Sequence, residues 1–483
     1  FERITWDEAY DDIVEHVKAI WEEYGPESIV VFGGTGREAN YWYTQWANLV
    51  FGSPNAVYAQ AGWSCYGPRI SNTAFMLGVA SEMLRLDKEE GNVVDWDFLD
   101  KCTVGFDADH KPADLKEDVN FLDYLNGVYD GEPKTAEWAS KICGVPVEKI
   151  TYFAREIGKE HDVWMLHNFA AARCNGSENV PQLFMTLSAM GGHYGKPGNC
   201  SANNYHANAG NGGPARVKAG SSGLPSLKNP IEGVIPGPQV WEACFTGKYR
   251  NVGDWYSGKG AQAGVDETCD IHCIIHDENA YLQTGPNMKR GIEAHRKMDF
   301  VLSKAQFLTT QALYSDIVLP VTTQWEVPGG LASSNREFLF CFSQVTEPLY
   351  EAKTDAQINT LIMEALGLDP STVYPISEKQ AFFNQIAGAT VIKEDGSGKY
   401  EPLVTITDAD LKEWGVSGKP QTGRVGLKEF IDNGGYQVER KLGDAYSSFI
   451  GYADYIKDPA ANPLKTKSGK LEITCQAKAD LFN

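Results

Sequence analysis

The clearest fold signal in the chain is the stretch Ser28 to Gly34, Ser-Ile-Val-Val-Phe-Gly-Gly. A short β-branched run that ends in paired glycines is typical of a buried parallel strand followed by a tight turn. Before it, Thr5 and Glu8 predict a capping box at the start of a helix. After it, the pattern predicts a helix over residues 37–50 and a strand over residues 56–59. This alternation predicts a doubly wound α/β fold, in which ligands bind outside the carboxyl ends of the strands.

A second α/β lobe is predicted over residues 240–370. Apolar runs at residues 273–276, 300–303 and 315–320 predict its strands, and helical spacing predicts a helix over residues 287–295. The chain is therefore divided into a first lobe, a connecting region, the second lobe and a mixed α+β tail. These parts cover residues 1–94, 95–239, 240–370 and 371–483 in that order.

The connecting region is predicted to be mostly helical up to residue 158, with a strand at residues 162–166 and a helix at residues 179–190. A segment rich in Gly, Asn, Ser and Pro follows, from Gly191 to about Pro238. A disordered linker is one interpretation of that segment. The aromatic, histidine and arginine residues between its glycines favour a structured binding loop instead. They are His193, Tyr194, His206 and Arg216.

Composition and charge restrict the class of protein. The 483 residues include 43 Lys and Arg against 64 Asp and Glu, a net charge of −21 that argues against nucleic acid or an anionic membrane as the main partner. Apolar residues make up 42%, and no apolar run approaches the roughly 18 to 20 residues of a membrane helix. The 10 cysteines contain no Cys-x-x-Cys pair, which excludes a dense disulfide framework and an ordinary zinc or iron–sulfur ligand set.

The common catalytic motifs are absent from the sequence. It contains no Walker loop, no Gly-x-Ser-x-Gly elbow and no His-Glu-x-x-His, and the nearest dinucleotide fingerprint, residues 34–39, lacks the expected acidic residue about 20 positions later. Cys65 follows the second predicted strand between Gly62 and Gly67. Its position is equally compatible with a buried structural thiol and with a reactive or metal-bound thiolate.

Several segments, taken in order, resemble the catalytic subunits of the dimethyl sulfoxide reductase family of molybdopterin oxidoreductases. The resemblance covers nearly the whole chain, and it is the shared order of the segments that makes it specific. The segments are Ile4 to Ala9, Ser64 to Pro68, Phe98 to Phe106, Asn175-Gly176, Gly191 to Gly198, Tyr314 to Pro320 and Ser468 to Ile473.

The resemblance implies an enzyme that carries a molybdenum bis(molybdopterin guanine dinucleotide) cofactor, with tungsten as an alternative metal. Cys65 matches the position whose side chain binds the metal, and a thiolate is a suitable soft ligand. The candidates for proton delivery are His167, Arg173, Glu178, His193, Tyr194 and His206. Of these, Arg173 and Glu178 resemble an Arg and Glu pair of the sulfoxide-reductase-like family members. The implied cofactor-binding residues are Gly33, Gly34, Gly176, Gly192, Lys196, Gly198, Asn279 and Gly285.

The reaction implied is oxygen-atom or two-electron transfer with a small-molecule substrate, as in anaerobic respiration. A non-redox hydratase or a reductive dehydroxylase of the same family is an alternative, and a scaffold subunit without the metal is another. The resemblance further implies an iron–sulfur electron-transfer subunit as partner, no direct membrane insertion, and a periplasmic or extracytoplasmic location.

The chain also departs from the family pattern. No cysteine cluster precedes Cys65, so a [4Fe–4S] centre is expected only if an upstream segment exists. A βαβ segment is expected to be missing between Ala74 and Asp95, and the carboxyl-terminal dinucleotide-binding domain should begin soon after Lys470. We therefore expect a core fragment of two doubly wound lobes with a glycine-rich cofactor loop.

Overall fold

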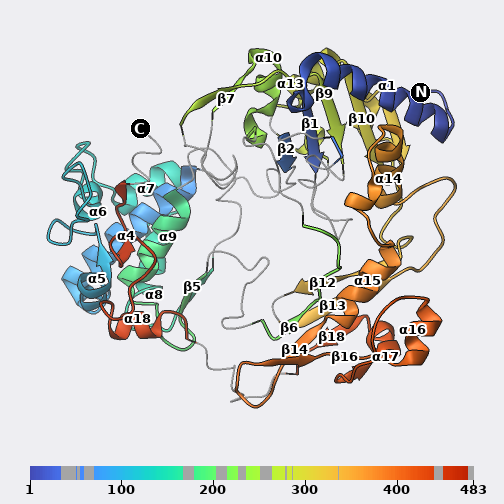
Figure 1. Ribbon diagram of the computed structural model, residues 1–483. Helices are drawn as coiled ribbons and strands as arrows, with labels where there is room; N and C mark the ends of the chain where they lie inside the picture. The colour runs from blue at the N-terminus through green and yellow to red at the C-terminus, as the bar shows by residue number, and fades with distance from the viewer. Residues whose placement is uncertain are drawn as a thin grey trace. The chain divides into compact units, whose positions relative to one another are not determined.

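The structure is a computed structural model that divides into two compact units, shown in Figure 1. Unit 1 comprises Phe1–Ser64 and Pro214–Arg440, and unit 2 comprises Cys65–Gly213 and Lys441–Asn483. The structure describes residues 1–33, 50–51, 55–58, 70–166, 179–202, 215–226, 235–250, 264–277, 280–285, 287–334, 337–439 and 450–476.

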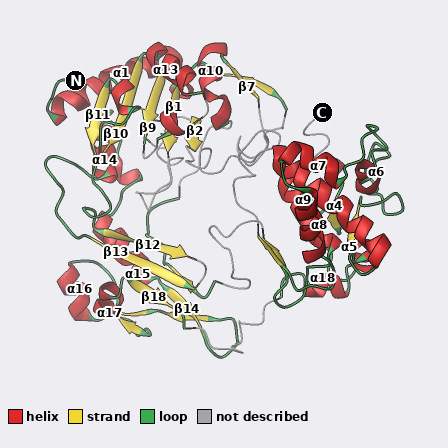
Figure 2. Ribbon diagram, turned by 180° about the vertical axis from the view of Figure 1, so that it is seen from behind, coloured by secondary structure: helices red, strands yellow, loops and turns green. Residues whose placement is uncertain are grey.

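Unit 1 is built on a five-stranded parallel sheet, seen from both sides in Figures 1 and 2. The strand order is β11-β10-β9-β1-β2. The bounds are β1 (Ile29–Gly33), β2 (Asn55–Tyr58), β9 (Cys273–His276), β10 (Phe300–Ala305) and β11 (Ile317–Pro320). The α/β class is confirmed, and each of these five strands overlaps a run that the sequence predicts to be a strand.

The division into a first and a second lobe differs from the structure. β1 pairs directly with β9, with Val30 opposite Ile274, so strands from residues 1–94 and 240–370 form one sheet. Sequence spacing shows where strands occur but not which strands pair, because parallel neighbours are separated by a dozen or more residues, with no upper limit on that length.

Helices cover both faces of this sheet, as a doubly wound fold requires. Ile29 and Val31 face α1 (Trp6–Tyr24) and α14 (Asp355–Ala365), whereas Val30 and Phe32 face α10 (Val240–Thr246), α12 (Tyr281–Thr284) and α13 (Met288–Lys297). All four strand side chains are fully buried. The predicted capping box is confirmed, since Thr5 and Glu8 exchange hydrogen bonds at the start of α1.

The rest of unit 1 is a mixed region with its own apolar core. Its sheets are β12-β13-β18, β15-β14-β6 and β16-β17, whereas the β7-β8 pair packs with α10 beside the parallel sheet. The strands are β6 (Val217–Lys218), β7 (Lys248–Arg250), β8 (Asp266–Thr268), β12 (Gly329–Ser334), β13 (Phe338–Ser343), β14 (Thr390–Ile392), β15 (Tyr400–Pro402), β16 (Val404–Thr405), β17 (Val425–Gly426) and β18 (Gly435–Gln437). The helices are α15 (Glu378–Ala387), α16 (Asp408–Trp414) and α17 (Leu427–Asp432), with short 3₁₀ turns at Pro26–Ser28, Gly237–Gln239, Ala312–Tyr314 and Pro370–Thr372.

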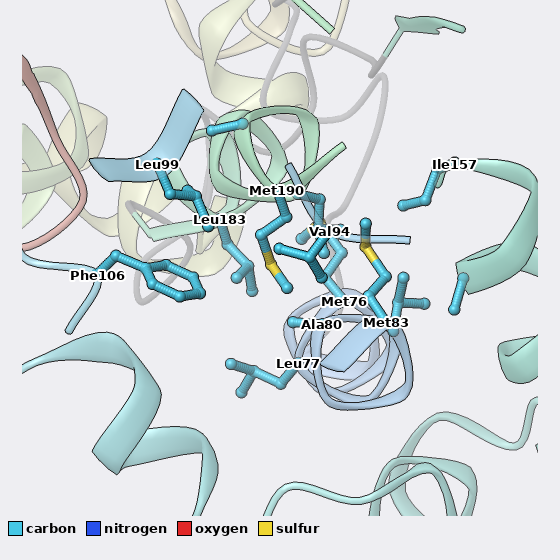
Figure 3. Close-up of a cluster of buried hydrophobic side chains, with 14 of the residues drawn as sticks. Met76, Leu77, Ala80, Met83, Val94, Leu99, Phe106, Ile157, Leu183 and Met190 are labelled. Carbon is cyan, nitrogen blue, oxygen red and sulfur yellow. The ribbon is translucent and has the colours of Figure 1, made fainter. Parts of the chain in front are cut away.

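Unit 2 is mainly helical and centres on α4 (Ile70–Glu90). Met76, Leu77, Ala80 and Met83 of this helix lie in the buried cluster drawn in Figure 3. The helices packed with α4 are α7 (Ala136–Cys143), α8 (Val147–Glu156) and α9 (Asn179–Met190), and α5 (Trp96–Cys102), α6 (Phe121–Leu125) and α18 (Ala453–Lys457) complete the unit. The predicted helix over residues 179–190 is confirmed.

Short parallel strand pairs join distant parts of unit 2. β4 (Trp164–Leu166) pairs with β5 (Cys200–Ala202), and β3 (Thr103–Val104) pairs with β19 (Leu471–Glu472). The β3–β19 pair places the last part of the predicted 371–483 tail in unit 2, and the remainder of that tail belongs to unit 1. Within the described ranges, no helix is long and apolar enough to cross a membrane.

Candidate cofactor-binding edge of the sheet

The strand order of the parallel sheet defines where a ligand is expected. Numbered along the chain, the sheet runs 2-1-3-4-5, because β2 lies on one side of β1 while β9, β10 and β11 follow on the other. In such a sheet the crevice opens outside the carboxyl ends of the two strands at the change of direction. Those strands are β1, which ends at Gly33, and β9, which ends at His276.

A buried charge cluster occupies this edge on the face covered by α14. The Lys304 ammonium lies 2.7 Å from an Asp277 carboxylate oxygen and 3.0 Å from an Asp355 oxygen, and these side chains are 3%, 3% and 7% exposed. Burial lowers the pKa of Lys304, but the two carboxylates outweigh it and leave the pKa above its ordinary value. The lysine therefore stays charged.

A histidine pair lies on the opposite face of the same strands. His295 Nδ1 is 2.6 Å from the Gly291 carbonyl oxygen, so Nδ1 carries the proton and donates it. Burial lowers the pKa of His295, which favours the neutral ring, and its Nε2 then accepts a hydrogen bond from His276 Nε2 at 2.7 Å. Beside it, the Ser303 and Ser315 hydroxyl groups lie 2.7 Å apart. The carboxyl edge thus carries hydrogen-bonded polar groups on both faces.

The first described stretch of the predicted glycine-rich segment, residues 191–202, lies in unit 2 and is folded against its core, whereas its later described residues, 215–226 and 235–238, belong to unit 1. Tyr194 stacks on Phe98 and donates to the Met185 carbonyl oxygen. Gly192 has φ +66°, and a Cβ there would lie 2.2 Å from an Asp95 oxygen, so only glycine fits this close approach. Residues 203–214, with His206, lie outside the described residues.

His193 is almost fully buried in this turn. Its Nε2 is 2.8 Å from the Ile157 carbonyl oxygen and its Nδ1 is 3.1 Å from Asn199 Oδ1. Burial is the largest effect on its pKa and lowers it. These contacts hold the turn together, so they favour a structural role. Its predicted part in proton delivery stays a prediction.

The other predicted cofactor residues fall in different places. Lys196 and Gly198 are exposed in unit 2. In unit 1, Gly33 ends β1, and Gly285 ends α12 with its N–H donating to the Tyr281 carbonyl oxygen at 2.6 Å. The predicted residues outside the described ranges are Cys65, His167, Arg173, Glu178, Gly34, Gly176 and Asn279.

Sequence reasoning assigned no role to Lys304, Asp355 or His295. The sequence did contain a signal for Lys304, because this residue interrupts the apolar run of β10. A charge in such a run is expected to be buried only when an oppositely charged side chain pairs with it. The residues that supply the partners are distant in sequence, so no spacing rule could identify them.

Thiols in the described residues do not resemble metal ligands. Burial raises the pKa of Cys244 to about 12 and that of Cys269 to about 11, so both are protonated near neutral pH. A cluster of Asp100, Asp107 and His110 brings possible ligand atoms within 4.8 Å of one another. Asp107 Oδ1 already accepts from His110 Nδ1 at 2.9 Å, and nothing else at the cluster indicates an ion.

Comparisons with known proteins agree with this architecture. The family model "Molybdopterin oxidoreductase" matches residues 170–365. The chain is 29% identical to dimethyl sulfoxide/trimethylamine N-oxide reductase of Cereibacter sphaeroides over 83% of this chain and 44% of the relative. It is 24% identical to dimethyl sulfoxide reductase DmsA of Escherichia coli strain K12 over 100% of this chain and 65% of that protein.

A solved structure with the same fold is acetylene hydratase from Pelobacter acetylenicus, with a TM-score of 0.59 and 15% identity. The match covers 99% of this chain and 68% of that one. At this identity the likeness concerns the fold. The chain spans 44% to 65% of the length of the first two curated relatives.

Proposed function

The chain belongs to the dimethyl sulfoxide reductase family of molybdopterin oxidoreductases, and from this premise we propose that it is the catalytic core of a molybdenum-dependent reductase. The observation that carries the proposal is the 2-1-3-4-5 parallel sheet, within the matched fold, whose carboxyl edge opens at β1 and β9. A dinucleotide-bearing cofactor binds at such an edge in doubly wound proteins.

Membership in the family implies a molybdenum–pterin cofactor, and we propose the bis(molybdopterin guanine dinucleotide) form, with tungsten as a second possibility. When bound, the group supplies oxygen-atom or two-electron transfer with a small substrate. The residues of the edge fit it: Gly33 adds no side chain where β1 ends, and the neighbouring strand end is held by hydrogen bonds. Backbone N–H groups at strand ends and turns suit the pyrophosphates of such a cofactor.

The further residue roles are part of the proposal. Cys65 is the metal ligand, and Gly34, Gly176, Asn279 and Gly285 line the dinucleotide sites with Gly192, Lys196 and Gly198. His167, Arg173, Glu178 or His193 delivers protons to the oxygen that leaves the substrate. We also propose an iron–sulfur subunit as electron donor and an extracytoplasmic location.

The test is metal and pterin analysis of the full protein purified without oxygen. Near-stoichiometric molybdenum and pterin, together with reduction of dimethyl sulfoxide or trimethylamine N-oxide by a reduced viologen dye, is the expected result. Cys65→Ala should abolish reduction while the thermal unfolding of the chain stays unchanged. A protein free of metal and pterin would instead indicate a scaffold, and a loaded protein without reductase activity would indicate a non-redox or dehydroxylating enzyme.

A further inference from the structure

We propose that Lys304 is a positioning residue that fixes the carboxyl edge of the sheet for the dinucleotide part of the cofactor. The inference rests on the proposed function. The proposed role needs no contact between Lys304 and the cofactor, because Lys304 acts through Asp277 and Asp355.

The ammonium of Lys304 joins three separately encoded elements. It lies on β10, Asp277 directly follows β9, and Asp355 is the first residue of α14. The Asp277 backbone N–H also donates to the Phe32 carbonyl oxygen at 2.7 Å, next to the end of β1. One charged group therefore links both strands of the crevice to the neighbouring strand and to a covering helix.

Stability alone gives little reason for a charge in this place. Removing three ionised groups from water costs more than their attraction usually returns, and well-packed apolar residues often serve equally well. A buried ion cluster does restrict the geometry, because Lys304 keeps both partners only when the strand end and the helix start lie in one arrangement. The cluster lies at the crevice, where such restriction positions a ligand.

The start of α14, where Asp355 lies, is fixed by two further interactions. Asp355 lies in the first turn of that helix, where a carboxylate is stabilised by the helix dipole. The preceding Thr354 caps the helix and donates its hydroxyl to a Glu378 oxygen at 2.8 Å. Since α14 is held by its own cap, the link through Lys304 transmits its position to β9.

The decisive variant removes the cluster without leaving an unpaired charge: Lys304→Met with Asp277→Asn and Asp355→Asn. A milder single variant, Asp277→Asn, keeps Lys304 paired with Asp355 and serves where the triple variant does not fold. Pterin is released from purified protein, oxidised and measured by fluorescence per folded chain, and thermal unfolding is followed on the cofactor-free protein.

We expect pterin per folded chain to fall roughly tenfold or more, as for other supporting groups of bound cofactors, with the unfolding temperature of the cofactor-free protein little changed. Lys304→Arg keeps the charge and should retain most of the pterin. The matched control is Arg424→Met, which removes a cation held by Glu401 at 2.6 Å and Glu394 at 3.2 Å away from the edge. That variant should keep wild-type pterin content.

Unchanged pterin in the folded triple variant, or in Asp277→Asn where the triple variant does not fold, would overturn the positioning role and leave the proposed function intact. A loss that appears equally in Arg424→Met would also overturn it, because destabilisation alone would then explain the result. Wild-type protein without pterin would overturn the proposed function and this inference together.

Discussion

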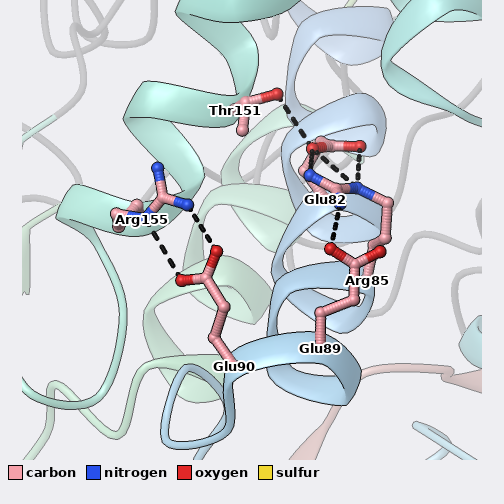
Figure 4. Close-up of polar contacts among 6 residues, drawn as sticks. All are labelled: Glu82, Arg85, Glu89, Glu90, Thr151 and Arg155. Carbon is pink, nitrogen blue, oxygen red and sulfur yellow. Dashed lines mark hydrogen bonds and ion pairs between the residues drawn. The ribbon is translucent and has the colours of Figure 1, made fainter.

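The ion clusters of the two units differ in how deeply they are buried. In unit 1 the charges of Lys304, Asp277 and Asp355 are buried at the edge of a sheet. In unit 2 the ion pairs around α4 are mostly half-exposed: Arg155 of α8 and Glu90 of α4 are 47% and 48% exposed, and within α4 Arg85, 44% exposed, pairs with the exposed Glu89 and the buried Glu82 (Figure 4). Buried charge is costly, so its presence at the sheet edge indicates a requirement other than stability.

The largest expected effect is that of breaking the buried cluster on one side. Lys304→Met leaves Asp277 and Asp355 buried without a cation, which should lower the free energy of unfolding by about 3–5 kcal/mol. Urea unfolding followed by fluorescence measures the change. A loss below about 1 kcal/mol would mean that these carboxylates are solvated, and the contrast with unit 2 would disappear.

The next effect tests the apolar half of the comparison. Met83 is fully buried in α4 (Figure 3), and Met83→Ala should cost about 2–5 kcal/mol through lost burial and the cavity left behind. Met288→Ala is the control, because that side chain is 44% exposed and its loss should change stability by less than about 0.5 kcal/mol. Equal urea midpoints for the two variants would contradict the assignment of the core.

A smaller effect is expected from the charge network of unit 2. Glu82 is mostly buried and accepts from Arg85 and from the Thr151 hydroxyl at 2.9 Å, so Glu82→Gln should cost about 1–3 kcal/mol. Glu89→Gln removes only an exposed pair and should cost less than about 1 kcal/mol. Urea unfolding measures both changes. If high salt lowered the free energy of unfolding of the wild-type protein as much as either substitution does, the network would be fully solvated.

The sequence predicted more of the fold than of the site, for physical reasons that particular residues illustrate. Local rules found the capping box of Thr5 and Glu8, the helix at residues 179–190 and the strand at 273–276, because each depends on neighbours in sequence. The pairing of β1 with β9, and the Lys304 cluster, depend on residues far apart in the chain. The composition of residues 191–199 suggested a ligand loop, but in the structure His193 and Gly192 pack against their own unit.

The smallest expected effect is a pH dependence of the free energy of unfolding that arises from the buried His193. Burial lowers the pKa of His193 below the ordinary value of about 6.5, so the unfolded chain binds a proton first as the pH falls. The contribution of His193 to stability is full above about pH 6.5 and is lost progressively below it, as the pH falls toward the folded-state pKa. Between pH 7.5 and pH 5.5, wild-type protein should therefore lose more stability than His193→Gln, which has no ionisable group there, by at most about 1.4 kcal/mol. An equal loss of stability in the two proteins would show that the ring is solvated, and a solvated ring would favour proton delivery by His193 over its structural role.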